Sequence, residues 1–526
     1  MSRLGIVTSG SLEGGIEVKL DSAVSVENMA VGRYVVVQGQ SRRFFGMIAD
    51  VSLGLADQAM ASTPPDMSDA FVAEVLNGTS VYGVIHVTPM LTLGADAGGP
   101  QPVKTVPAHF SAVELASEQD IELVFGAENK ENFYIGTPLD METRICLNLP
   151  ELVKRSNGIF GKSGTGKTFL TRMLLIGMLQ KSKAVNLIFD MHNEYGWEGT
   201  SEGQRKVKAL KQLFPAKVAI FTLDEANSRQ RGASIDFVVK IGYDEIKPED
   251  IALLRQTLNL TEPAVEAAYQ LHRRFGRDWV QSALALESSE AAGGQPPIHE
   301  STLQNLKRGL AKISRLPFIS ASVARDAVGC IIEHLDRGIN VVLEFGRYRD
   351  EAVYVLVANM LARRIYNLYQ ERVEKAMADN SPPPTPLVIT IEEAHKFLNP
   401  EVAGQTIFGA IAREMRKYNV TLLVIDQRPS GIYEEVMSQL GTKITCLLDN
   451  EKDIESVLSG VSGKNALKSV LARLESKQQA LIFGHAVPMP VVIRTREYGS
   501  AASYRDFMVE PPPGEQVAKD IEDLWK

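Results

Sequence analysis

Cysteine is scarce in this chain of 526 residues, which has three, Cys146, Cys330 and Cys446, far apart. An odd number of widely spaced cysteines gives no disulfide or zinc-binding pattern and is typical of a reducing cytosol. No apolar run reaches the ~18 residues that a transmembrane helix needs. Residues 1–5 lack the apolar core of a signal peptide. We therefore expect a cytoplasmic protein with no membrane contact.

The chain also lacks an excess of positive charge, since 56 Lys and Arg stand against 64 Asp and Glu, for a formal net charge of −8. This balance excludes a surface that is basic throughout. It is compatible with a basic pore, because a closed ring can place its cations inside and its anions outside. Two basic pairs, Lys307-Arg308 and Arg363-Arg364, carry no signal that assigns them to such a pore.

A glycine-rich loop at residues 158–168 is the most informative feature that is present. Gly161 to Thr168 fits the pattern G-x-x-x-x-G-K-[ST], with an apolar run before it and a helix-prone apolar run after it. Glycines let the backbone wrap a phosphate, and a helix N-terminus offers free N–H groups and a positive dipole end. Lys167 reaches the terminal phosphates, and the Thr168 hydroxyl holds Mg²⁺. The predicted nucleotide-binding residues of the loop are Gly161, Ser163, Gly164, Thr165, Gly166, Lys167 and Thr168.

The pattern of apolar residues divides the chain into several predicted domains and segments. Residues 1–90 have short β-branched runs separated by glycines, which predicts a small β-barrel. Residues 91–150 are expected as a linker and lead-in. Alternating strands and helices over 151–500 predict a parallel α/β core, interrupted at about 245–320 by a helical insertion. Residues 501–526 are expected to be a loose tail or an arm that docks on a neighbour.

A second motif is the apolar strand 387–391, which ends in Glu392-Glu393. Paired acids at a strand end are what a P-loop ATPase needs opposite its phosphate loop. The first acid helps to hold Mg²⁺, and the second polarises the attacking water. We therefore predict that Glu392 is a metal ligand and that Glu393 is the catalytic base.

Two further strand ends carry polar residues. Asp190 ends the strand that follows the phosphate-loop helix and is expected at the ligand-binding edge of the sheet, although an ordinary capping role fits it as well. Gln427 follows the strand 420–426 and is placed to sense the γ-phosphate. Arg416 precedes that strand and is a candidate for stabilising charge on the phosphoryl group, with a solvated helix end as the alternative.

Taken together, these motifs resemble the HerA family of the HerA–FtsK branch of P-loop ATPases. The specific part of the resemblance is formed by three pieces, 190–195, 392–395 and 413–417 with 426–430. The family pattern has Asp at position 392 and Thr or Ser at 426, where this chain has Glu392 and Asp426. The resemblance implies a RecA-like core after a small β-barrel.

The resemblance also implies an ATP- and Mg²⁺-dependent homo-hexamer that translocates double-stranded DNA. Relatives of this kind work with a NurA-type nuclease in end processing or with effectors in antiphage systems. Arg155 resembles the arginine that reaches the neighbouring subunit's nucleotide. Two alternatives stay open, a P-loop kinase or GTPase that acts on a small molecule, and a nucleotide-binding scaffold without turnover. The chain has no guanine-specific Asn/Thr-Lys-x-Asp motif.

Overall fold

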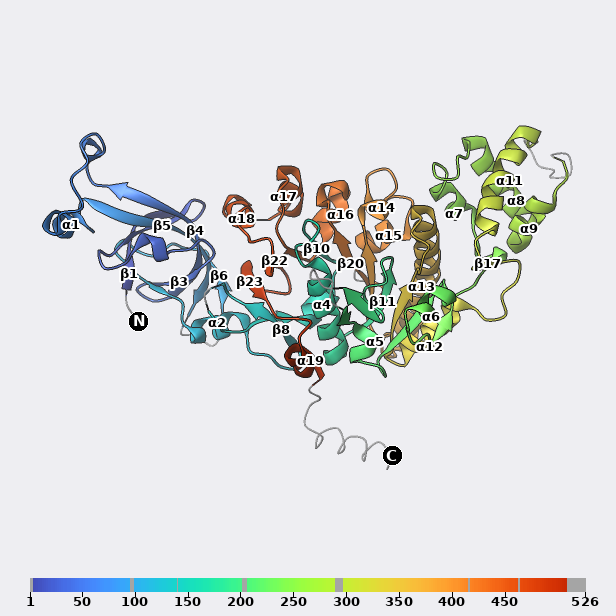
Figure 1. Cartoon of the computed structure of the whole chain (residues 1–526), viewed down its shortest axis with the longest axis horizontal. Coiled ribbons are helices and arrows are strands. Elements are labelled where there is room, and N and C mark those ends of the chain that lie inside the picture. Colours follow the sequence, from blue (N-terminus) through green and yellow to red (C-terminus); the bar gives the residue numbers. More distant parts are fainter. Residues whose placement is uncertain are drawn as a thin grey trace, which may run out of the picture. The chain divides into compact units, whose positions relative to one another are not determined.

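The computed structural model describes residues 3–94, 99–139, 141–200, 206–288, 297–414, 417–461 and 464–508 (Figure 1). The chain forms two compact units. The first consists of Met1–Lys167 and Ile425–Arg496, and the second of Thr168–Val424 and Glu497–Lys526. The division between them falls at the start of helix α4 (Lys167–Lys181) and within strand β20 (Val420–Asp426).

The first unit begins with a β-barrel. Its sheet has the order β2-β1-β7-β3-β4-β5-β6, and an added pairing between β2 and β5 closes it. The interior is filled by Val, Ile, Leu and Phe side chains. Closure pairs the strand edges, which would otherwise be exposed. The strands run past residue 90, into the segment expected as a linker. Their bounds are β1 Arg3–Ser11, β2 Gly15–Leu20, β3 Tyr34–Gln38, β4 Arg43–Leu55, β5 Val81–Leu93, β6 Gln101–Pro102 and β7 Ala112–Leu115.

The rest of the first unit contains the strand that leads into the phosphate loop. Six strands follow the order β10-β21-β22-β23-β8-β9, in which β10 and β21 are parallel and the other pairs are antiparallel. Their bounds are β8 Asn132–Thr137, β9 Ile145–Asn148, β10 Asn157–Phe160, β21 Thr442–Thr445, β22 Gln479–Gly484 and β23 Val491–Thr495. Helices α2 (Glu118–Phe125), α3 (Leu149–Val153), α16 (Glu434–Gln439), α17 (Glu451–Val457) and α18 (Lys464–Leu471) connect them.

The second unit is built on parallel strands in the order β15-β14-β18-β11-β19. Every described residue of β11, β14, β18 and β19 is buried, as expected for a parallel sheet covered on both faces. The strands are β11 Val185–Asp190, β14 Val218–Thr222, β15 Phe237–Val238, β18 Asn340–Glu344 and β19 Leu387–Glu392. The helices around them include α4, α6 (Glu225–Gln230), α12 (Ala327–Asp336), α13 (Glu351–Asp379) and α15 (Ile407–Glu414).

The helical insertion forms a bundle of α7 (Pro248–Leu253), α8 (Glu262–Phe275), α9 (Trp279–Ala285) and α11 (Glu300–Ser314) (Figure 1). Two ion pairs hold its base to helix α13. Arg363 donates to both oxygens of Asp250 at 2.6 and 2.9 Å, and Arg364 pairs with Glu245. The predicted architecture, an α/β core with a helical insertion after a small β-barrel, is confirmed.

The three cysteines are buried, and none of them forms a disulfide. None of the helices in the described ranges combines the length and apolar character that crossing a membrane requires. The first residues of the predicted tail form helix α19 (Ala501–Met508), where the Phe507 carbonyl accepts a 2.5 Å hydrogen bond from Gln180 of α4. Residues 509–526, which include the predicted docking arm, lie outside the described residues.

Candidate active site

The phosphate loop follows β10 in the first unit and leads into α4, which belongs to the second unit from Thr168 onward. Gly164 and Gly166 have φ values of 78° and 93°, a region that side-chain-bearing residues rarely adopt. The Thr165 hydroxyl and the Lys167 ammonium both donate to the carbonyl of Lys162, each at 2.8 Å. Lys162 itself is exposed and pairs with Asp449 at 2.7 Å. Two side chains of the loop are thus hydrogen-bonded to the loop's own backbone, and Lys167 lies in the first turn of the helix.

Two more predicted residues belong to the first unit. Gln427 is exposed directly after β20, where the preceding Asp426 accepts the backbone N–H of Arg428 at 2.7 Å. Arg155 follows α3, its side chain is only 15% exposed, and its guanidinium donates to Glu151 at 3.0 Å. Arg416 lies outside the described residues.

In the second unit, the structure brings together Asp190, Glu392 and Glu393. Strands β11 and β19 are parallel neighbours, paired as far as Phe189 and Ile391, so their carboxyl ends meet at one edge of the sheet. Asp190 is fully buried. One of its oxygens accepts the N–H of Glu194 at 2.8 Å, and the other accepts those of Tyr195 and Gly196 at 2.8 and 3.2 Å. Its carboxylate therefore caps the loop 190–196, the kind of role that the sequence left open as an alternative.

Glu392 is the most constrained carboxyl group in this cluster. Its Oε1 accepts the Tyr195 hydroxyl at 2.9 Å, and its backbone N–H and carbonyl both bind the Tyr354 hydroxyl at 3.1 Å. Its Oε2 is buried and has no hydrogen-bond partner among the described residues. Burial, together with the nearby charge of Asp190, raises the pKa of Glu392 well above its usual value. A cation at Oε2 would satisfy this atom, so the residue fits the metal-side role predicted for it.

Glu393 differs sharply from its neighbour. It has a left-handed backbone with φ of 49°, and such strain in a non-glycine residue costs about 1–3 kcal/mol and is concentrated at functional sites. Its carboxylate lies 3.7 Å from Nδ1 of His395, and the side chain is 21% exposed. The two consecutive acids therefore have different environments, one buried and one open to a reactant.

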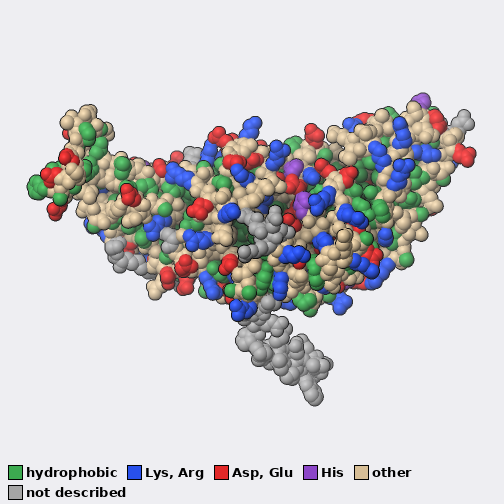
Figure 2. All heavy atoms as spheres, in the orientation of Figure 1, with side chains coloured by type: hydrophobic (Ala, Val, Ile, Leu, Met, Phe, Trp, Pro, Cys, Tyr) green, Lys and Arg blue, Asp and Glu red, His purple; other side chains and the backbone are tan. Residues whose placement is uncertain are grey.

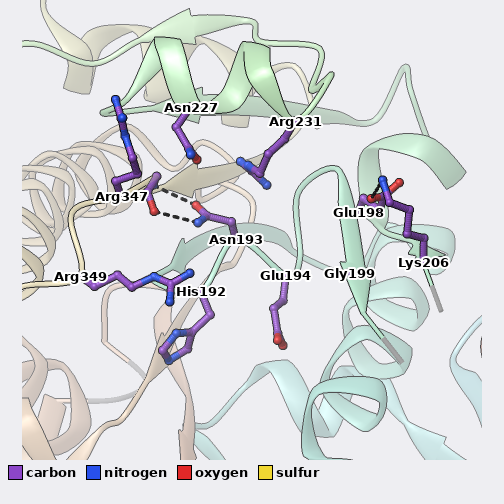
Figure 3. Close-up of a pocket in the computed structure, with 11 residues that line it drawn as sticks. His192, Asn193, Glu194, Glu198, Gly199, Lys206, Asn227, Arg231, Arg347 and Arg349 are labelled. Carbon is purple, nitrogen blue, oxygen red and sulfur yellow. Dashed lines mark hydrogen bonds and ion pairs between the residues drawn. The ribbon is translucent and has the colours of Figure 1, made fainter. Parts of the chain in front are cut away.

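The loop 190–196 is held from two sides by residues that sequence reasoning did not identify. Asn193 makes two 2.9 Å hydrogen bonds to the backbone of Gly346, which follows β18. The side chains of His192 and Glu194 point away from these two hydrogen bonds (Figure 3). From the other side, Arg172 of α4 donates to the Glu194 carbonyl through Nε at 3.0 Å and Nη2 at 2.5 Å.

Arg172 is fully buried although it carries a charge. The rings of Phe169, Tyr195 and Tyr498 lie 5.3, 6.0 and 5.7 Å from its guanidinium carbon. A Cβ at Gly199 would overlap the guanidinium, so the chain passes directly over it. The sequence feature that could have pointed to Arg172 is that it is a single arginine inside the apolar helix after the phosphate loop.

A cavity of about 510 Å³ lies beside this loop, lined by residues that follow β11 and β18 and by α6 (Figure 3). Two of its arginines are neutralised, because Arg231 pairs with buried Glu344 and Arg347 with Asp224 at 3.0 Å. Burial, and next the charge of Asp190, raise the pKa of Glu344 to about 6.

A phosphate loop at a helix N-terminus, together with a buried strand that ends in two unlike acids, defines a P-loop ATPase. Residues 133–365 match the family described as the central domain of the helicase HerA, and residues 4–106 match the HAS barrel domain. The resemblance of the sequence to the HerA family of ATPases is therefore confirmed.

Relatives named DNA double-strand break repair helicase HerA extend over most of the chain. That of Sulfolobus acidocaldarius is 21% identical over 505 residues, which is 95% of each chain. That of Pyrococcus furiosus is 24% identical over 407 residues, 73% of this chain and 72% of its own. Among solved structures, VirB4 of Thermoanaerobacter pseudethanolicus matches 72% of this chain and 99% of its own, with 13% identity and a TM-score of 0.47.

Proposed function

We propose that this protein is a motor that hydrolyses ATP to move along double-stranded DNA, working as a homo-hexamer with a nuclease or an antiphage effector. The observation that carries the proposal is the contrast between Glu392 and Glu393 at the end of β19, in a chain that also has a complete phosphate loop. Similarity to relatives that are named as DNA repair helicases supports DNA as the polymer along which the motor moves.

The proposed roles follow from chemistry at each position. Lys167 and the backbone N–H groups of the loop bind the phosphates, and Glu393 accepts a proton from the attacking water. Gln427, exposed after β20, senses the γ-phosphate. Arg155 and Arg416 are the candidates for stabilising transferred charge. In the trans role, Arg155 exchanges its contact with Glu151 for the nucleotide of a neighbouring subunit.

Thr168 and Glu392 are the residues that would hold Mg²⁺. The unpartnered, buried Oε2 of Glu392 suits a cation, and a hydroxyl and a carboxylate are oxygen donors of the kind that Mg²⁺ prefers. The ion, when bound, neutralises charge on the phosphates.

The experiment that tests this function compares ATP hydrolysis with and without long duplex DNA. We expect DNA to stimulate turnover and Glu393→Gln to abolish it while ATP still binds. A slow rate that does not respond to DNA would instead favour a nucleotide-dependent scaffold, and stimulation by a small-molecule acceptor alone would favour a kinase.

A further inference from the structure

Helix α11 of the insertion has one strongly basic face. Residues 301–325 contain five Lys or Arg residues and no Asp or Glu, in a chain whose formal net charge is −8. The helix buries Leu303, Leu306, Leu310 and Ile313 against the bundle. Arg308, Lys312 and Arg315, spaced by four and three residues, lie together on the opposite side and are exposed. We call these three residues the α11 basic face.

The charged side chains of the α11 basic face have no partners among the described residues of the protein. None of the three makes a side-chain hydrogen bond or ion pair with a residue in the described part of the chain. Other basic residues of the region behave differently, since Arg363 and Arg364 hold the insertion to α13 and Lys307 donates to the Leu286 carbonyl at 2.5 Å. Figure 2 shows Lys and Arg side chains gathered over α8 and α11.

Helix capping accounts for only part of this pattern. Lys312 and Arg315 lie at the C-terminal end of α11, where cations stabilise the helix dipole. Arg308 lies in the middle of the helix, where that effect is absent. Arg315 follows Arg308 by two helical turns, so the face extends for about 10 Å along the helix axis. A duplex of that length carries about six phosphate charges.

We propose that the α11 basic face contacts the phosphate backbone of duplex DNA outside the ATPase site. This inference rests on the proposed function, because it assumes that DNA is the track. Guanidinium and ammonium groups bind phosphate oxygens strongly, and contacts to phosphates position a protein on the duplex without reading its sequence. The contact is therefore sequence-independent and salt-sensitive, as a moving motor requires.

The test measures binding of the full-length protein to labelled duplexes of two unrelated sequences over a range of salt concentrations. The variant is Arg308→Gln with Lys312→Gln. The matched control is Arg337→Gln with Lys375→Gln, which removes one Arg and one Lys that are exposed at the end of α12 and on α13 of the same unit. Basal ATPase activity without DNA and the thermal unfolding midpoint show that each variant is folded.

For the α11 variant, we expect the slope of log K against log salt to become less steep by about 2, or about 1 for each phosphate that is no longer bound. Between about 50 and 200 mM salt, this slope change is a factor of about 16 in relative affinity. Both duplexes should be weakened equally at low salt, and the control should keep the wild-type slope. An unchanged slope in the α11 variant, with normal wild-type binding, overturns the inference alone. Absence of duplex binding by the wild type at low salt overturns the proposed function as well.

Discussion

Replacement of Arg172 by methionine is the sharpest test of how the active-site loop is positioned. The guanidinium is fully buried, donates twice to the Glu194 carbonyl and faces three aromatic rings. Methionine is apolar and ends where the Nε of arginine lies, so it keeps the packing of the stem, removes the guanidinium and leaves that carbonyl without its partner. We expect two effects, a loss of stability and a displacement of the loop whose N–H groups bind Asp190.

The size of the first effect follows from these contacts. A hydrogen bond to a charged group contributes about 1.5–3 kcal/mol, and a desolvated cation–π contact contributes about 1–2 kcal/mol. Recovered desolvation of the charge offsets part of this loss. We therefore expect the free energy of unfolding to fall by about 2–4 kcal/mol. Displacement of the loop by about 1 Å should lower kcat by about 100-fold with little change in ATP binding.

The matched control is Arg363→Met, which removes another largely buried arginine whose partner, Asp250, belongs to the insertion. Thermal unfolding and basal ATPase activity without DNA are measured for both variants. We expect both variants to lose stability, Arg363→Met the more because it leaves the buried Asp250 carboxylate unpaired, and a loss of kcat in Arg172→Met alone. Equal turnover in the two variants would refute the positioning role, and an unchanged unfolding midpoint in Arg172→Met would refute the energetic reasoning.

Three further predictions concern single groups. Glu393→Gln should lower turnover by about 10²–10⁴-fold and preserve ATP binding, whereas Lys167→Ala should weaken binding itself; near-normal turnover in the Gln variant moves the role to Glu392. Arg155→Ala should abolish turnover but leave nucleotide binding intact, and rings mixed from Arg155→Ala and Lys167→Ala subunits should regain activity. If demonstrably mixed rings stay inactive, the trans role is not supported and Arg416 becomes the candidate. The pKa of Glu344, about 6 in the folded protein against 4.5 ordinarily, means that the folded state binds this proton more tightly. Stability from this group is therefore full below pH 4.5 and lost as pH rises through 6, by about 2 kcal/mol. Glu344→Gln should remove this decline in unfolding measurements from pH 4.5 to 7, and an unaltered decline would assign it to another group.

The sequence alone determined the features that depend on local pattern. The phosphate loop was readable because its glycines, its lysine and the flanking apolar runs are consecutive in the chain. The strand ending in Glu392-Glu393 was readable because parallel strands are nearly continuous apolar runs. The barrel and the helical insertion followed from a change in the period of apolar residues, although the barrel strands extend to Leu115, beyond the expected residue 90.

Only the tertiary structure decided what each polar side chain does. Asp190 ends a strand, as predicted, but its oxygens are occupied by the N–H groups of its own loop, and no spacing in the sequence specifies that loop's path. The acids Glu392 and Glu393, at and just after the end of β19, look equivalent in the sequence, yet only Glu392 is buried beside Tyr195 and Tyr354. Arg172 looks misplaced in an apolar helix until two tyrosine rings and a carbonyl from distant segments surround it. Local periodicity selects strands and helices, whereas burial and partners between distant segments arise only when the chain has packed.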